Sequence, residues 1–160
     1  MAFLAVPGPF DFALTTERFR AFGVDRANLW HEGGLHRVVA GREVRMEAAD
    51  GGVDVEPLDG EIEPVVRMVL GLVFELEPFY LWAGGDEILA PIVPSLAGFR
   101  PSLTPDPFEM LVGAIISQQV SLFSAFAIRN RLIERFGVQV GDAWAFPTRE
   151  RLTLATEDEL

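Results

Sequence analysis

Residues 106–121 constrain the fold more than any other part of this chain, because they combine a helix start, an apolar stripe and a sudden polar interruption. The side chain of Asp106 can cap a helix, and Pro107 suits the first helical position. Glu109 follows the cap by three residues and completes a capping box. The apolar residues recur at helical spacing and predict one buried face, made of Phe108, Leu111, Val112, Ile115 and Ile116.

A polar corner interrupts this helix. Ser117, Gln118 and Gln119 end the apolar face, and Ser121 is placed to cap a second helix. The two glutamines are therefore predicted to lie at a corner between two helices. Uncharged polar side chains at the end of an apolar helix need hydrogen-bonding partners, and a protein core supplies few of them.

The first sixty residues predict a small antiparallel sheet with one short helix. Thr15 or Thr16 can cap the helix, which Gly23 would end. Residues 28–32 and 35–40 are strand-like, and the Gly33-Gly34 pair between them fits a hairpin loop.

A second hairpin can be predicted down to its register. Residues 43–48 alternate between charged and apolar side chains, which is the periodicity of a strand. With a turn at Asp50 and Gly51, one whole face becomes apolar; the facing pairs are then Ala48 with Val53, Met46 with Val55, and Arg45 with Glu56. A helix over residues 64–74 is expected to pack across the back of this sheet, burying Val73 among others.

The 106–121 stretch resembles the opening of the helix-hairpin-helix DNA glycosylase domain. The match continues through residues 98–101 before it and 125–137 after it, and is most specific over 98–137. Upstream, residues 9–12 (Pro-Phe-Asp-Phe) resemble the start of the sheet domain in the DNA-3-methyladenine glycosylase II branch. The resemblance covers nearly the whole chain, although the first hundred residues match mainly in layout.

This resemblance implies an α+β fold with two parts. Residues 1–83 would form a small antiparallel sheet with packed helices, and residues 84–160 would begin an all-α helix-hairpin-helix glycosylase domain. The family's phosphate-gripping hairpin and its catalytic aspartate are expected after residue 160. A second capping box at residues 156–159, followed only by Leu160, also predicts a helix that is not completed. A frayed polar tail is the alternative for these last residues.

The resemblance also implies a function in base excision repair. Such enzymes flip a damaged base out of duplex DNA and hydrolyse its N-glycosidic bond, here with alkylated purines such as 3-methyladenine as substrates. Gln119 falls at the position that is inserted into the vacated stack, Gln118 would support the loop or approach the flipped base, and Ser121 would hold the second helix in register. Phe10 and Phe19 could line a base pocket. No catalytic residue is assigned within the chain, so residues 1–160 alone are expected to be inactive.

For Gln118 and Gln119 an ordinary structural role remains open, in which both amides satisfy backbone groups of their own loop. Read without the resemblance, the residues would indicate a soluble domain with an unusual glutamine corner. A non-catalytic, acidic α+β protein-interaction module is therefore the alternative function. Self-association through the apolar segment 122–128, which runs from Leu122 to Ile128 with only Ser124 polar, would favour that alternative.

The charge balance argues against tight DNA binding by this chain. Its formal net charge is −11, and all 13 basic residues are arginine. Residues 1–99 hold 7 arginines and 16 acids (−9), and residues 100–160 hold 6 arginines and 8 acids (−2). Phosphate contacts normally require a basic face, and none is visible in the sequence. Damaged duplex DNA is thus expected as a partner only of the complete enzyme.

Other chemistries find little support. The chain has no cysteine, which excludes thiolate metal sites, disulfides and thiol catalysis. His31 and His36 would face each other across the first hairpin and could hold a metal ion, with Glu43 as a speculative third ligand. Two half-exposed strand histidines are the preferred interpretation, so neither a metal nor a cofactor is expected. No signal sequence or membrane span is apparent, and a cytoplasmic location is predicted.

Overall fold

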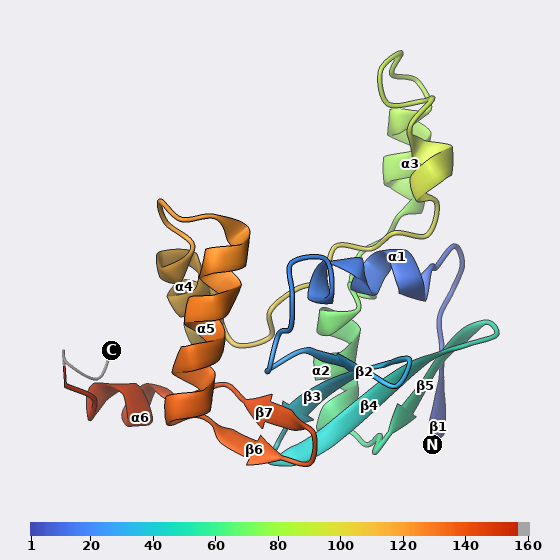
Figure 1. The fold of residues 1–160 in the computed structure, drawn as a ribbon. Coiled ribbons are helices and arrows are strands. Elements are labelled where there is room, and N and C mark those ends of the chain that lie inside the picture. Colours follow the sequence, from blue (N-terminus) through green and yellow to red (C-terminus); the bar gives the residue numbers. More distant parts are fainter. Residues whose placement is uncertain (157–160) are drawn as a thin grey trace.

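The computed structural model describes residues 1–156 of the chain (Figure 1). In chain order its elements are β1 (Ala2–Ala5), α1 (Phe12–Thr16), the 3-10 helix η1 (Glu17–Phe19), β2 (Leu29–His31), β3 (Gly34–Val39), β4 (Arg42–Ala49), β5 (Gly52–Glu56), α2 (Ile62–Val69), α3 (Glu77–Ala83), the 3-10 helix η2 (Val93–Leu96), α4 (Pro107–Ile116), α5 (Leu122–Phe136), β6 (Val138–Val140), β7 (Ala143–Ala145) and α6 (Arg149–Thr153). The predicted α+β class is confirmed. The second predicted capping box extends over residues 157–159, which lie outside the described residues.

Five strands form an antiparallel sheet in the order β1-β5-β4-β3-β2. The predicted register of the β4–β5 hairpin is confirmed, because Ala48 pairs with Val53, Met46 with Val55 and Arg45 with Glu56. The β2–β3 loop is shifted by one residue from the prediction. Gly34 pairs with His31 inside the sheet, so the two loop residues are Glu32 and Gly33.

The hydrophobic core lies between the sheet and the helices of the first half. Helix α2 crosses behind the sheet (Figure 1), and its buried side chains join those of the strands in one cluster. This helix ends at Val69, earlier than predicted, and Val73 is exposed. The chain turns at Gly71, whose positive φ of 63° stops the helix before Val73 can reach the core.

The cap of helix α1 differs from the prediction. Asp11, rather than a threonine, caps the helix by accepting a hydrogen bond from the backbone N–H of Leu14 at 2.8 Å. Thr15 and Thr16 are instead buried, and the Thr16 hydroxyl donates a hydrogen bond to the carbonyl oxygen of Phe12 at 2.6 Å. A threonine that bonds back to the preceding turn satisfies its hydroxyl inside the core without capping anything.

Both predicted caps of the second half are confirmed. The Asp106 side chain accepts from the N–H of Phe108 at the start of α4, and Ser121 accepts from the N–H of Ser124 at the start of α5. Helix α5 ends at Phe136, just before Gly137. The capping box is wrong, however, because the Glu109 carboxylate does not turn back to the cap.

Glu109 belongs instead to a buried ring of five polar side chains, the Glu109 ring. Its carboxylate accepts from Arg37 of β3 at 2.5 Å and from Arg129 of α5 at 2.6 Å. Asn28 accepts from Arg37 at 2.6 Å and donates to Asp25 at 2.9 Å. An ion pair of 3.6 Å between Asp25 and Arg129 closes the ring. The ring joins α4 and α5 to the sheet half of the molecule.

The Glu109 ring also corrects the predicted face of α4. Glu109 is only 2% exposed, whereas Leu111 and Ile115, expected in the core, are both 58% exposed. The carboxylate must reach the two guanidinium groups, so the helix is turned with Glu109 inward. An acid on an apolar helix thus faces the body of the protein because buried charges need partners.

Residues 72–99, here named the arm, project away from the sheet (Figure 1). The arm contains two short helices, α3 and η2. The division at residue 83 stays a prediction. Among residues 1–156, no helix is both long enough and apolar enough to cross a membrane.

Replacing Gly98 tests how the base of the arm is built. Gly98 has φ +85°, and an added Cβ would lie 2.6 Å from the backbone nitrogen of Asp11. We expect Gly98→Ala to lower the free energy of unfolding by about 3 kcal/mol. The matched control is Gly33→Ala, with φ +82° but no atom within 4 Å, which should cost only about 1 kcal/mol. Urea unfolding of both variants measures the difference, and equal losses would contradict the close packing at Gly98.

Removing Glu109 should leave two arginines in the ring without their main partner. We expect Glu109→Ala to cost about 3 kcal/mol of unfolding free energy, because breaking a buried ion pair strands the remaining charge. Glu134, which pairs with Arg26 at 2.7 Å on the surface, provides the control. Glu134→Ala should cost less than about 1 kcal/mol. Urea or thermal unfolding gives both values, and a small loss in the Glu109 variant would show that the ring does not hold the halves together.

Candidate functional site

The α4–α5 corner presents the two predicted glutamines to solvent. Helix α4 ends at Ile116, and the hydroxyl of the next residue, Ser117, donates to the carbonyl oxygen of Gly113 at 2.8 Å. The N–H of Gln118 donates to the carbonyl oxygen of Ile115 at 3.1 Å. Gln119 has a φ of +60°, in the left-handed region that a residue with a Cβ rarely adopts. This conformation reverses the chain so that Ser121 can start α5.

The side chains of Gln118 and Gln119 are exposed, and within residues 1–156 neither makes a hydrogen bond to the protein. The structural role considered above, in which the amides satisfy their own loop, therefore has no hydrogen bond to support it. A strained residue whose polar side chain serves no internal partner is a common feature of functional sites. Both amides are available to an external partner.

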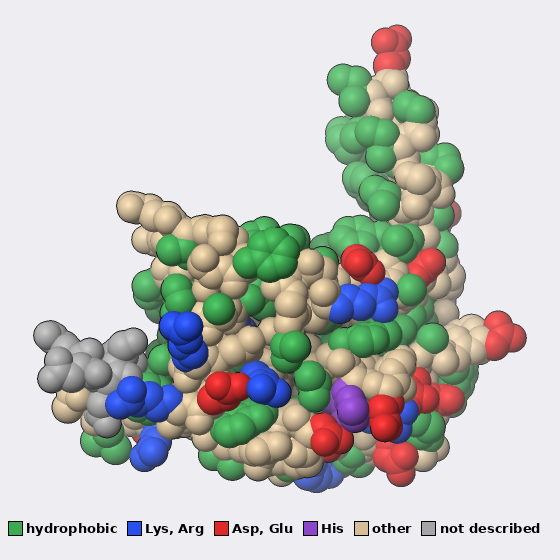
Figure 2. All heavy atoms as spheres, in the orientation of Figure 1, with side chains coloured by type: hydrophobic (Ala, Val, Ile, Leu, Met, Phe, Trp, Pro, Cys, Tyr) green, Lys and Arg blue, Asp and Glu red, His purple; other side chains and the backbone are tan. Residues whose placement is uncertain are grey.

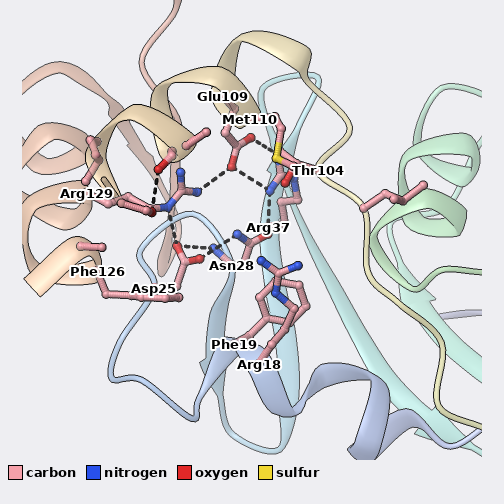
Figure 3. Close-up of a pocket in the computed structure, with 16 residues that line it drawn as sticks. Arg18, Phe19, Asp25, Asn28, Arg37, Thr104, Glu109, Met110, Phe126 and Arg129 are labelled. Carbon is pink, nitrogen blue, oxygen red and sulfur yellow. Dashed lines mark hydrogen bonds and ion pairs between the residues drawn. The ribbon is translucent and has the colours of Figure 1, made fainter. Parts of the chain in front are cut away.

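A pocket of about 260 Å³ opens between the first half of the molecule and helices α4 and α5 (Figure 3). Ser117 belongs to its wall, so the pocket begins where the corner begins. Phe19 and Phe126 give it apolar surface, and the Glu109 ring forms much of its polar lining. The corner and the pocket are thus adjoining parts of one candidate site.

The two phenylalanines proposed from the sequence are not brought together. Phe19 is buried and borders this pocket. Phe10 lies outside this pocket and packs edge-on against Phe12, with ring centres 6.4 Å apart. It lines a separate hollow together with Gly8. Only Phe19 is therefore positioned to contact a group held in the pocket beside the corner.

Charge in the pocket is largely balanced by the ring. Burial by itself lowers the pKa of the Arg129 guanidinium, but the charges of Asp25 and Glu109 and their hydrogen bonds outweigh it and raise that pKa above its ordinary value. Arg129 is thus fixed as a cation, and its guanidinium also lies over the Phe146 ring at 4.8 Å. Its charge is paired with Asp25 and Glu109, which holds the walls of the pocket together.

Arg18 is the exposed cation of the pocket. Its guanidinium lies 5.4 Å from the centre of the Phe19 ring and makes a long, 3.4 Å hydrogen bond to the carbonyl oxygen of Ser102. Figure 3 shows Arg18 and Phe19 side by side. Sequence reasoning missed Arg18, Arg37 and Arg129. An arginine within the apolar β3 strand, and an acid within the apolar α4 helix, were the signals that a buried ion pair was needed.

The two histidines lie close together but do not pair across the hairpin. His36 is opposite Leu29 and His31 is opposite Gly34, with the two rings 5.7 Å apart. His36 is buried, rather than half-exposed as predicted, and its Nδ1 lies 2.8 Å from Glu43. Glu43 also accepts from the N–H of Asp142 at 3.3 Å. Within the part of the chain that the structure describes, no group of three ligating side chains is arranged to hold a metal ion.

Comparison with known proteins places the chain beside DNA glycosylases. No family model matches the sequence. Over 90 residues the chain is 31% identical to a DNA-3-methyladenine glycosylase of Bacillus subtilis, a match that covers 54% of this chain and 30% of that protein. The structure of a 3-methyladenine DNA glycosylase from Archaeoglobus fulgidus matches with a TM-score of 0.83 at 23% identity, covering 99% of this chain and 60% of that one.

An 8-oxoguanine glycosylase/lyase from Clostridium acetobutylicum, solved with DNA containing cytosine opposite 8-oxoguanine, matches with a TM-score of 0.73 at 21% identity. That match covers 94% of this chain and 52% of the other. The chain therefore spans less than two thirds of each of these three proteins. The resemblance to DNA glycosylases is confirmed, and the chain has the fold that forms one portion of these larger enzymes.

Proposed function

We propose that this chain is the N-terminal part of a base excision repair DNA glycosylase. The complete enzyme would remove alkylated purines such as 3-methyladenine from duplex DNA by flipping the base and hydrolysing the N-glycosidic bond. The observation that carries this proposal is the corner, where an exposed Gln119 with φ +60° has no partner within residues 1–156 and adjoins a pocket. The similarity to glycosylases that act on 3-methyladenine supports the choice of lesion.

The corner residues have separate roles in this proposal. Gln119 fills the space left by the flipped nucleotide and hydrogen-bonds the widowed base, which its exposed amide can do as both donor and acceptor. Gln118 supports the loop or approaches the flipped base, and Ser121 keeps α5 in register by capping it. Phe19 offers its ring to a base that enters the pocket. A catalytic aspartate, which the resemblance requires, is not assigned to any residue of this chain.

The acidic interaction module remains a second candidate for one reason. Leu122 is 51% exposed and Phe123 65% exposed, on a helix segment that was predicted to need a protein partner. Self-association through segment 122–128 is therefore kept as a proposal. Phe22 covers part of this segment, with its ring 5.9 Å from that of Phe123. A cytoplasmic location also stays a prediction.

Gln119→Ala tests the wedge without requiring catalysis. The net charge of −11 makes binding by residues 1–160 weak overall. We still expect a duplex with a central abasic site to bind more tightly than an undamaged duplex, and the variant to lose about tenfold in the affinity for the abasic duplex, or about 1.4 kcal/mol. Fluorescence anisotropy measures both affinities. At about 0.1 M salt, screening limits the range of the repulsion between the net charge and DNA to about 10 Å. Gln139→Ala, at another exposed glutamine, should leave the affinity unchanged. Equal affinities of the two variants would contradict the wedge role.

Purified residues 1–160 should release no 3-methyladenine from alkylated duplex DNA beyond the uncatalysed background. The reason is that, by the resemblance, the aspartate that stabilises the cationic sugar-like transition state is expected after residue 160. Chromatography of the released bases is the measurement, with the Bacillus subtilis relative as the positive control. Base release by residues 1–160 would instead place the catalytic group within this chain.

A further inference from the structure

The pocket beside the corner carries a net positive charge in an acidic chain. Its lining has a formal charge of +1, against −11 for the whole chain, and the charged residues that line it are Arg18, Arg37, Arg129, Asp25 and Glu109. The two buried arginines, Arg37 and Arg129, both bond to the Glu109 carboxylate. Arg18 makes no ion pair with an acid among residues 1–156. The excess positive charge of the pocket is therefore that of Arg18.

The guanidinium of Arg18 is held in place with most of its donors free. Arg18 belongs to η1, and its side chain is exposed. The guanidinium lies 5.4 Å from the centre of the Phe19 ring, whose position is fixed by burial. Among the described residues, its one hydrogen bond is the long contact with the carbonyl oxygen of Ser102. A guanidinium has several N–H groups in one plane, so most of them remain available to an external acceptor.

Arg18 lies where a nucleotide in the pocket would meet it. Ser117, at the start of the corner, lines the same pocket. In Figure 3 Arg18 and Phe19 come from the first half of the molecule, whereas Glu109 comes from α4. Because the Arg18 guanidinium lies against the Phe19 ring, a nucleotide whose base contacts this ring brings its sugar and phosphates close to Arg18.

Most acids of the chain lie away from this pocket. On the face that Figure 2 shows, the acidic side chains gather over the sheet and at the tip of the arm, and few lie over α4 and α5. At physiological salt, exposed charges more than about 8 Å apart are largely screened from each other. The local charge of the pocket, rather than the net charge of the chain, therefore decides whether an anion is attracted to it.

Two parts of a flipped nucleotide could meet this guanidinium, and their charges decide between them. A purine alkylated at a ring nitrogen carries a positive charge while it is joined to its sugar, so a guanidinium at short range repels it. A phosphate is an anion, and two of its oxygens match a pair of N–H groups of an arginine. The phosphate is therefore the favoured partner.

We propose that Arg18 binds a phosphate of the flipped nucleotide through charge-assisted hydrogen bonds, while Phe19 contacts its base. This role rests on the proposed function and adds a second contact to it. Gln119 fills the space that the nucleotide leaves, whereas Arg18 holds the nucleotide once it has left. The ligand is a phosphodiester of DNA next to the flipped sugar.

Arg18→Gln tests this contact, because glutamine keeps hydrogen-bond donors but removes the charge. Binding of residues 1–160 to a duplex with a central abasic site is measured by fluorescence anisotropy, from about 50 to about 200 mM salt. One phosphate contact contributes about 0.9 to the slope of log affinity against log salt. We expect Arg18→Gln to weaken binding about tenfold at the lowest salt and to reduce the slope by about 0.9. Arg18→Lys should keep the slope, because it keeps the charge.

Arg20→Gln is the matched control. Arg20 is close to Arg18 in the sequence, but it pairs with Glu17 at 2.9 Å and lies over the Trp30 ring. It should leave the slope unchanged, and circular dichroism verifies that each variant is folded. Equal changes of slope in the two glutamine variants would overturn the role of Arg18. A loss of affinity in Arg18→Gln that is the same at every salt concentration would also overturn it, because the contact would then be with an uncharged group.

An undamaged duplex separates the role of Arg18 from the proposed function. Arg18 is assigned to a flipped nucleotide, so Arg18→Gln should leave the slope for the undamaged duplex unchanged. An equal effect on both duplexes, or no binding to either, would overturn the assignment. If the unaltered chain binds the abasic duplex no more tightly than the undamaged one, the proposed function itself fails. If that preference holds and Arg18→Gln leaves the slope unchanged, only the role of Arg18 fails.

Discussion

The Glu109 ring is the interaction on which the arrangement of the two halves depends. It joins side chains from the loop before β2, from β3, from α4 and from α5, segments that lie up to about a hundred residues apart in the sequence. Every charged member has a partner of opposite charge, and Asn28 bridges the remaining gap between Asp25 and Arg37. Buried charges are tolerated only when paired and hydrogen-bonded in this way. The ring therefore sets the one orientation of α4 and α5 that satisfies all of them.

That orientation has consequences along the whole of α4. Its inner face and the polar members of the ring line a pocket that Phe19 and Phe126 complete. At the C-terminal end of the helix, next to this pocket, the backbone of Gln119 has a φ of +60° and the amides of Gln118 and Gln119 face solvent. The outward turn of Leu111 and Ile115 is the cost of bringing Glu109 inward. The need to pair one buried carboxylate thus decides which face of the helix packs against the protein.

The surface is divided between two kinds of exposed group. The corner exposes uncharged amides beside a pocket that contains Arg18, whereas the arm exposes aromatic and aliphatic side chains among acids only. Only the corner has the chemistry that suits a duplex, because the phosphates of DNA repel acids. The concentration of negative charge in the first 99 residues, which argues against DNA binding when summed over the chain, is thus partly located on a surface remote from the corner. Net charge alone would have missed this separation.

Local sequence determined the elements whose physics is local. Alternation fixed the β4–β5 register, since only one pairing makes a whole face apolar, and the caps at Asp106 and Ser121 needed only a short side chain and a free N–H group. The position of the glutamine corner followed from those caps. The tertiary structure decided which face of α4 is buried, that Phe19 but not Phe10 reaches the pocket, and that Arg37 and Arg129 hold Glu109. These outcomes depend on charges that are distant in sequence and meet only after folding. The free-energy cost of leaving one of these charges buried and unpaired exceeds the free energy gained by burying the apolar face that periodicity predicts.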